Sequence, residues 1–138
     1  MWTLTRRLRN YHGSDETEPY EGIRPVDFDV GDQTAMFEVK ATGVWKIELR
    51  SLSTTRSLPY GAAISGSGDE VVRLMGAPKT LHIVGNSASR YFGVIGYGDS
   101  WDLLANETDA YDGRVLVESG VIAIEIQATG PWSITSEP

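Results

Sequence analysis

Cysteine is absent from this chain of 138 residues, and histidine occurs only at positions 12 and 82. The lack of cysteine excludes disulfides, thiol catalysis and thiolate metal sites. A zinc site needs at least three converging ligands, which two distant histidines do not supply. A serine hydrolase needs a histidine to activate its serine, and none follows the esterase-like segment Gly98-Asp99-Ser100-Trp101. We therefore predict no metal site, no cofactor and no enzymatic activity.

The chain also lacks long apolar runs and an excess of basic charge. No stretch approaches the ~18 apolar residues of a membrane span, and the first ten residues have no apolar core typical of a signal peptide. The formal net charge is −7, whereas binding to nucleic-acid phosphates needs a basic surface. We expect no membrane or nucleic-acid partner, and if the protein leaves its cell we expect a route other than a signal peptide, such as release inside an assembly.

Acidic residues are abundant, but their spacing does not match a calcium-binding loop. Calcium takes about six to eight oxygen ligands, and no D-x-D-x-D spacing occurs in the sequence. Turn formation at strand ends explains such residues more simply, and nothing selects a glycosidase pair among them. The candidate pairs are Asp69 with Glu70, Asp99 with Asp102, and Asp109 with Asp112.

Short alternating segments separated by Gly, Asp, Asn and Ser make up most of the chain. In residues 44–50, Trp45, Ile47 and Leu49 alternate with mostly charged residues, which is the pattern of a half-buried strand. The apolar fraction of 41% indicates a folded chain. The regular spacing of the short strands predicts an all-β fold, an antiparallel β-sandwich of jelly-roll or immunoglobulin-like type. We expect hairpins from residues 35–41 with 44–50 and from 80–85 with 91–97, further strands at 71–75, 114–118, 121–128 and 132–135, and one helical turn at 100–107.

The motif E-x-x-A-T-G-x-W-x-I occurs twice, at residues 38–47 and 125–134. Each copy is typical of a strand, a glycine turn and a second strand that buries an indole. We predict two equivalent hairpins whose tryptophans, Trp45 and Trp132, anchor the core. The alternative, a pair of sugar-stacking platforms, is less favoured because an isoleucine follows each tryptophan on the same face. Residues 81–92 look like a looser third copy with a longer loop.

The strand-G-x-W-x-I unit resembles a β-rich repeat module of uncharacterised extracytoplasmic proteins of actinobacteria and of their phages. The segments SGSGDEVV at residues 65–72, DLLANE at 102–107 and YDGRVL at 111–116 share in this resemblance. It covers residues 36–136 and leaves the N-terminal segment unmatched. The resemblance implies the β fold and the host range, and it carries no catalytic motif.

Residues 1–25 are mostly polar and differ from the rest, so we predict an extended N-terminal arm at 1–25 and a β-sandwich domain at 26–138. Residues 1–10 carry a charge of +3, which leaves −10 for residues 11–138 out of the total of −7. This asymmetry favours an arm that is attracted to the acidic body of a neighbouring copy. An arm that folds back along its own sheet is an open alternative. The predicted partner-binding residues are Trp2, Arg6, Arg7 and Arg9.

These features predict a non-enzymatic structural protein of a bacteriophage particle, such as a capsid decoration, minor capsid or minor tail protein. It would lie in the virion and contact protein subunits, including copies of itself. The alternative is a bacterial surface or secreted β-sandwich module that binds carbohydrate or protein. The candidate ligand-binding aromatic residues of that module are Tyr91, Phe92, Tyr97 and Trp101.

Overall fold

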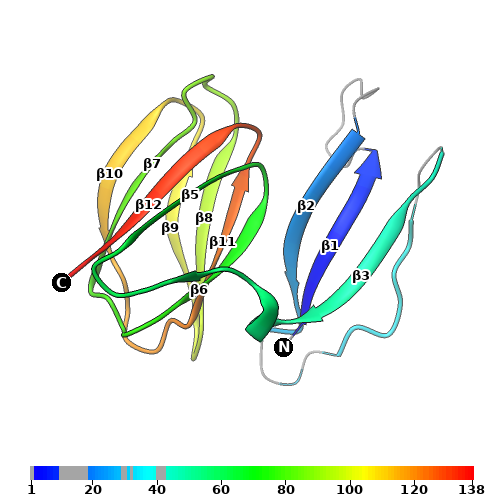
Figure 1. The fold of residues 1–138 in the computed structure, drawn as a ribbon, viewed down its shortest axis with the longest axis horizontal. Coiled ribbons are helices and arrows are strands. Elements are labelled where there is room, and N and C mark those ends of the chain that lie inside the picture. The colour runs from blue at the N-terminus through cyan, green and yellow to red at the C-terminus, as the bar shows by residue number, and fades with distance from the viewer. Residues whose placement is uncertain (1, 10–18, 29–30, 32, 40–42) are drawn as a thin grey trace.

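The computed structural model describes residues 2–9, 19–28, 31, 33–39 and 43–138, and within them the regular structure is strand apart from one 3-10 turn, η1 (Leu52–Thr54). Two packed sheets form a β-sandwich, and a smaller third sheet lies beside it (Figure 1). The prediction of an all-β sandwich is confirmed.

The sandwich consists of a five-stranded sheet in the order β4-β6-β11-β8-β9 and a four-stranded sheet in the order β10-β7-β12-β5. Neighbouring strands in it are antiparallel, except that β4 runs parallel to β6. The strands are β4 (Ser57–Leu58), β5 (Ala63–Ser67), β6 (Glu70–Leu74), β7 (Thr80–Gly85), β8 (Phe92–Tyr97), β9 (Trp101–Glu107), β10 (Tyr111–Leu116), β11 (Ala123–Ala128) and β12 (Pro131–Glu137).

The third sheet, which we call the N-terminal sheet, contains β1 (Trp2–Arg9), β2 (Pro19–Val26) and β3 (Lys46–Ser51) in the order β2-β1-β3. The predicted arm is therefore extended, but it holds two strands rather than one. β1, the central strand of the N-terminal sheet, pairs with β2 and β3 of its own chain. This arrangement matches the alternative of an arm that folds back along its own sheet. β2 runs across the predicted boundary between residues 25 and 26.

Alternation along the strands places apolar side chains between the two sheets of the sandwich. In β8, Phe92 and Val94 are fully buried, whereas Ile95 and Tyr97 point to the other face and stay partly exposed. The inward residues of β8 and β11 face Leu81 from the four-stranded sheet within one continuous core. The largest fully buried side chains of the core are Phe92, Leu58, Leu81, Ile83, Ile124, Ile126 and Ile134.

Residues 101–107 form strand β9, so the predicted helical turn is wrong. Val94 pairs with Ala105, but the next residue, Ile95, pairs with Leu103, which leaves Leu104 as the extra residue of a β-bulge. Because of the bulge, Leu104 and Ala105 are both buried, at 7% and 5% exposed. Two consecutive buried residues break the alternation of a strand and imitate helical spacing.

The predicted hairpins do not form. β3 pairs with β1, and residues 35–39 are not a strand, while the predicted turn at Thr42 lies outside the described residues. β7 and β8 belong to different sheets, and so do β11 and β12. The segments between them carry the chain across the sandwich instead of turning it back within one sheet.

The two copies of the repeated motif are not equivalent. Trp132 is 3% exposed, and its Nε1–H group donates a hydrogen bond of 3.0 Å to the carbonyl of Gly68. Trp45 is 50% exposed and precedes β3. The prediction of a second core anchor is wrong for Trp45, because β3 joins the N-terminal sheet instead of the sandwich.

Close packing of Trp132 on glycine gives a test of the core. An alanine Cβ at Gly66 would overlap Cζ2 of the buried Trp132 ring, so we expect Gly66→Ala to lower the free energy of unfolding by about 1–3 kcal/mol. Gly130→Ala is the control, because nothing lies within 4 Å of its Cβ position, and we expect a change within about 0.5 kcal/mol. Urea unfolding followed by fluorescence measures both, and equal losses would contradict this packing.

Candidate functional site

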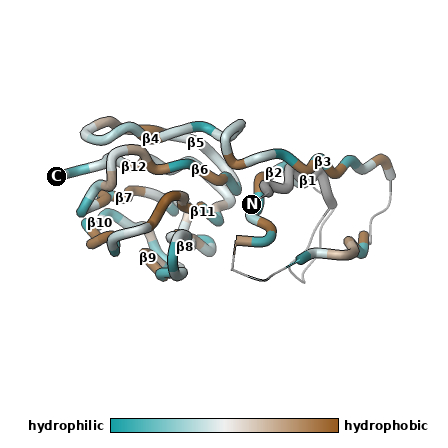
Figure 2. The backbone as a smooth tube through the Cα atoms, turned by 90° about the horizontal axis from the view of Figure 1, so that it is seen from below, coloured by the Kyte–Doolittle hydropathy of each residue, from teal (hydrophilic) through white to brown (hydrophobic). Residues whose placement is uncertain are grey.

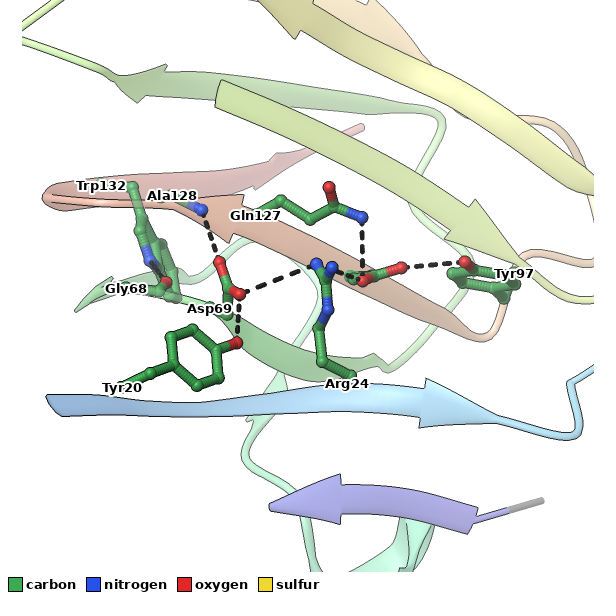
Figure 3. Close-up of polar contacts among 9 residues, drawn as sticks. Tyr20, Arg24, Gly68, Asp69, Tyr97, Gln127, Ala128 and Trp132 are labelled. Carbon is green, nitrogen blue, oxygen red and sulfur yellow. Dashed lines mark hydrogen bonds and ion pairs between the residues drawn. The ribbon is translucent and has the colours of Figure 1, made fainter. Parts of the chain in front are cut away.

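The N-terminal sheet contacts the sandwich through β2, and these contacts converge on two carboxylates, Asp69 and Glu125 (Figure 3). The carboxylate of Asp69 accepts hydrogen bonds from the Tyr20 hydroxyl and, at 2.9 Å, from the backbone N–H of Ala128. Its backbone carbonyl accepts the N–H of Ile23 at 3.0 Å. We call the following set the junction: Tyr20, Arg24, Asp69, Tyr97 and Glu125.

Glu125 lies on the outer face of β11 and is nevertheless only 3% exposed. Its Oε1 lies 3.0 Å from Nη1 of Arg24, and it also accepts a 3.0 Å hydrogen bond from Nε2 of Gln127. The Tyr97 hydroxyl donates to Oε2 at 2.8 Å. A buried carboxylate is tolerated when its oxygens are paired, and Arg24 from the N-terminal sheet is one of the three groups that pair those of Glu125.

Close approach of β2 to the sandwich requires a glycine and is completed by an aromatic contact. Gly22 is buried, and a Cβ there would lie 2.8 Å from Cβ of Asp69. After β2, the ring of Phe28 packs against Tyr97 with centroids 4.8 Å apart at an angle of 53°. Arg24 also lies 3.7 Å from Oδ2 of Asp69. The junction is thus a dense, mainly polar contact between two sheets.

A second feature is a group of exposed large apolar side chains between residues 36 and 49. Val44 is fully exposed, and Met36 is 81% exposed. Large apolar side chains that stay exposed are candidates for contact with another molecule. We call the group Met36, Phe37, Val44, Trp45 and Leu49 the apolar segment.

Charged residues of β3 accompany the apolar segment. Glu48 forms 2.7 Å ion pairs with both Lys46 and Arg50. The hydrogen bond from Lys46, and then the one from Arg50, lower the pKa of Glu48. The two cations therefore favour the ionised form of Glu48.

The predicted ligand-binding aromatic residues do not form one platform. Tyr97 and Trp101 pair across β8 and β9, and Trp101 is 62% exposed. Phe92 is fully buried, so its predicted role in ligand binding is wrong, because β8 turns this residue toward the core. Tyr91 lies at the other end of β8, where its ring covers Gly93.

The predicted arm residues Trp2, Arg6, Arg7 and Arg9 all lie in β1, and their side chains fall outside the described part of the structure. In the pairing register, the backbone of Arg6 lies between Gly22 and Ile47. Sequence reasoning missed Arg24 and Glu125 as the residues that join the N-terminal sheet to the sandwich. Its one usable signal was the glutamate of the repeated motif, which is Glu125 in the second copy.

The junction has the character of a structural contact. Within the described ranges, no group of three or more His, Asp or Glu side chains could hold a metal ion. His82, which hydrogen-bonds Asp112 at 2.6 Å, lies on the four-stranded sheet and not at the junction.

No helix in the described part of the chain is long and apolar enough to cross a membrane. No protein-family model, curated protein or solved structure matches this chain.

Arg24→Met tests how far Glu125 depends on its cation. We expect the variant to lose about 1–3 kcal/mol of unfolding free energy, because a buried charge is left without its partner. The double variant Arg24→Met with Glu125→Gln removes that charge while keeping an amide in the network, and it should be more stable than Arg24→Met alone. Urea unfolding measures the difference.

Arg114→Met is the matched control. Arg114 also lies 3.0 Å from a carboxylate, that of Glu137, but its side chain is 61% exposed. Exposed ion pairs contribute about 0–1 kcal/mol, so this variant should lose less than Arg24→Met. A double variant no more stable than Arg24→Met would show that Glu125 tolerates its charge alone.

Proposed function

We propose that this protein is a non-enzymatic structural protein of a phage particle, of the capsid decoration, minor capsid or minor tail type. It docks to neighbouring protein subunits through the N-terminal sheet and the apolar segment. The observation that carries the proposal is the exposure of that segment, with Val44 at 100% and Met36 at 81%. The sandwich has a complete core of its own, so this segment is not needed to fill it.

The position of β3 at the edge of the N-terminal sheet also supports a docking role. Among the strands that the structure describes, β3 pairs with β1 alone, so its outer backbone groups face away from the sheet. Unpaired edges are templates for pairing with another chain, and native proteins cover or block them. A permanent neighbour in a particle would cover both this edge and the apolar side chains beside it.

Charge favours an acidic partner surface for this docking. β1 and β3 together contain five basic residues and one acidic residue, although the whole chain has a net charge of −7. Complementary charge speeds association and selects the orientation of the partners. The six residues are Arg6, Arg7, Arg9, Lys46, Arg50 and Glu48.

A carbohydrate- or protein-binding module of the bacterial surface is the second candidate. The adjacent pair Tyr97 and Trp101 favours it, since an exposed indole offers an apolar face with a polar edge. The Tyr97 hydroxyl already donates to Glu125, which leaves Trp101 as the main contact. In such a module the N-terminal sheet would bind no partner subunit.

Particle fractionation tests the first proposal. We expect the wild-type protein to co-sediment with phage particles on a density gradient, and the double variant Val44→Ser with Trp45→Ser to lose about tenfold or more of its bound fraction, equivalent to 1.4 kcal/mol. Both residues are exposed, so folding, checked by circular dichroism, should be unchanged.

Leu116→Ser is the control for this experiment, because Leu116 is 79% exposed on β10, away from the N-terminal sheet. It should co-sediment like the wild type. Equal binding of the Val44→Ser, Trp45→Ser variant and the wild type would refute docking through this segment. Recovery of the wild type with bacterial envelopes in place of particles would support the second candidate.

A further inference from the structure

The N-terminal sheet covers part of the outer face of the five-stranded sheet, beside β6 and β11 (Figure 2). On this outer face Val71 pairs with Glu125, and they are 0% and 3% exposed. Val71 is not part of the core cluster between the two sheets of the sandwich. Burial of this outer face is therefore supplied by the strand packed against it, which is β2.

One short segment of chain connects the N-terminal sheet to the sandwich. β3 ends at Ser51 and β4 begins at Ser57, so the connection comprises residues 52–56, of which three form η1. β1, β2 and β3 pair with one another. Five extended residues span about 17 Å, so opening of η1 would let the N-terminal sheet move as a unit with its own strand pairing intact.

The covered face is selective for the strand that lies on it. At Gly22 a Cβ would lie 2.8 Å from Cβ of Asp69, so a side chain there does not fit. On the same face of β2, two positions away on either side, the Tyr20 hydroxyl donates to Asp69 and Arg24 lies 3.0 Å from Glu125. Another strand that fits must therefore present a tyrosine, a glycine and an arginine at alternate positions. β2 of a second copy of this chain does so.

We infer that the N-terminal sheet is an exchangeable element, which covers the outer face of a second copy of this chain when copies are closely packed. The inference rests on the proposed function and deepens it by naming a partner and its surface. Arg24 of one copy then pairs with Glu125 of the neighbouring copy, through the contacts that the single chain makes within itself. Exchange of an identical element between copies is a low-cost route to an assembly.

Local concentration decides between the closed single chain and the exchanged form, because the contacts are the same in both. A short flexible connection holds two surfaces at an effective concentration of about millimolar, so a single chain closes on itself in dilute solution. In a particle, where copies of a subunit lie next to one another, a neighbouring sandwich competes with the chain's own. Assembly would therefore favour the exchanged form.

Reciprocal charge reversal tests the exchange. Arg24→Glu places two carboxylates opposite each other within one chain, and Glu125→Arg places two guanidinium groups there, so each variant alone has a weakened contact. When the two purified full-length variants are mixed, exchange brings opposite charges together at both contacts. We expect mixed dimers at a yield about tenfold above that of either variant alone. Native mass spectrometry measures this yield when one variant carries a mass tag.

Arg114→Glu mixed with Glu137→Arg is the matched control. This ion pair, with a distance of 3.0 Å, joins β10 and β12. Both strands belong to the four-stranded sheet, so movement of the N-terminal sheet cannot exchange them. We expect no gain in dimers on mixing. Junction variants that stay monomeric when mixed, or that dimerise no more than this control, overturn the inference.

A shortened connection gives a second test that does not depend on the folding of the charge-reversed variants. Deletion of Ser53 and Thr54, which are both exposed, hinders closure within one chain, and short connections under strain favour exchange. We expect this variant to sediment as a dimer, and the addition of Arg24→Glu to reduce the dimer fraction. A monomeric deletion variant, or a dimer that Arg24→Glu leaves unchanged, overturns the exchange.

The tests of exchange and of the proposed function fail separately. Particle binding that depends on Val44 and Trp45, together with junction variants that do not associate, would keep the proposed function and remove the exchange. Mixed dimers of the junction variants without particle-bound protein would keep the exchange and remove the phage assignment.

Discussion

The carboxylate of Asp69 is the point at which three parts of the chain meet. Its oxygens accept the N–H of Ala128 at the end of β11 and the hydroxyl of Tyr20 in β2. The adjacent Gly68 carbonyl accepts the indole N–H of Trp132 from the opposite sheet. One short segment before β6 thus fastens both sheets of the sandwich and the N-terminal sheet.

Aromatic rings placed over glycines let the sandwich pack closely at that point. The Trp132 ring occupies the space where Gly66 would carry a Cβ, and the Phe92 ring does the same at Gly85. Glycine weakens a strand because it adds no side chain and costs more conformational entropy. Coverage by a ring restores buried area at these positions. The chain contains 15 glycines and still forms twelve strands within its described residues.

Alternation of apolar and polar residues was enough to place most sandwich strands, but not to choose their partners. Thr129 and Gly130 look like a hairpin turn in the sequence, yet they join strands of different sheets. The same motif at Gly43 adopts a positive φ of 96°, whereas Gly130 does not. Local pattern determines which residues are extended, and pairing is decided by long-range burial that a repeated motif does not encode. This is why Trp132 is buried and Trp45 is not.

The junction could not be predicted, because Arg24 and Glu125 are about a hundred positions apart and neither belongs to a recognisable site. Its polar character has a consequence for function. An attachment built from ion pairs and hydrogen bonds leaves exposed apolar side chains of the N-terminal half, such as Val44, outside the contact. If apolar contacts held the N-terminal sheet against the five-stranded sheet, those side chains would be buried within one chain. Charge and hydrogen bonds instead hold the N-terminal sheet, and apolar side chains such as Val44 stay exposed, which is the division that the proposed docking requires.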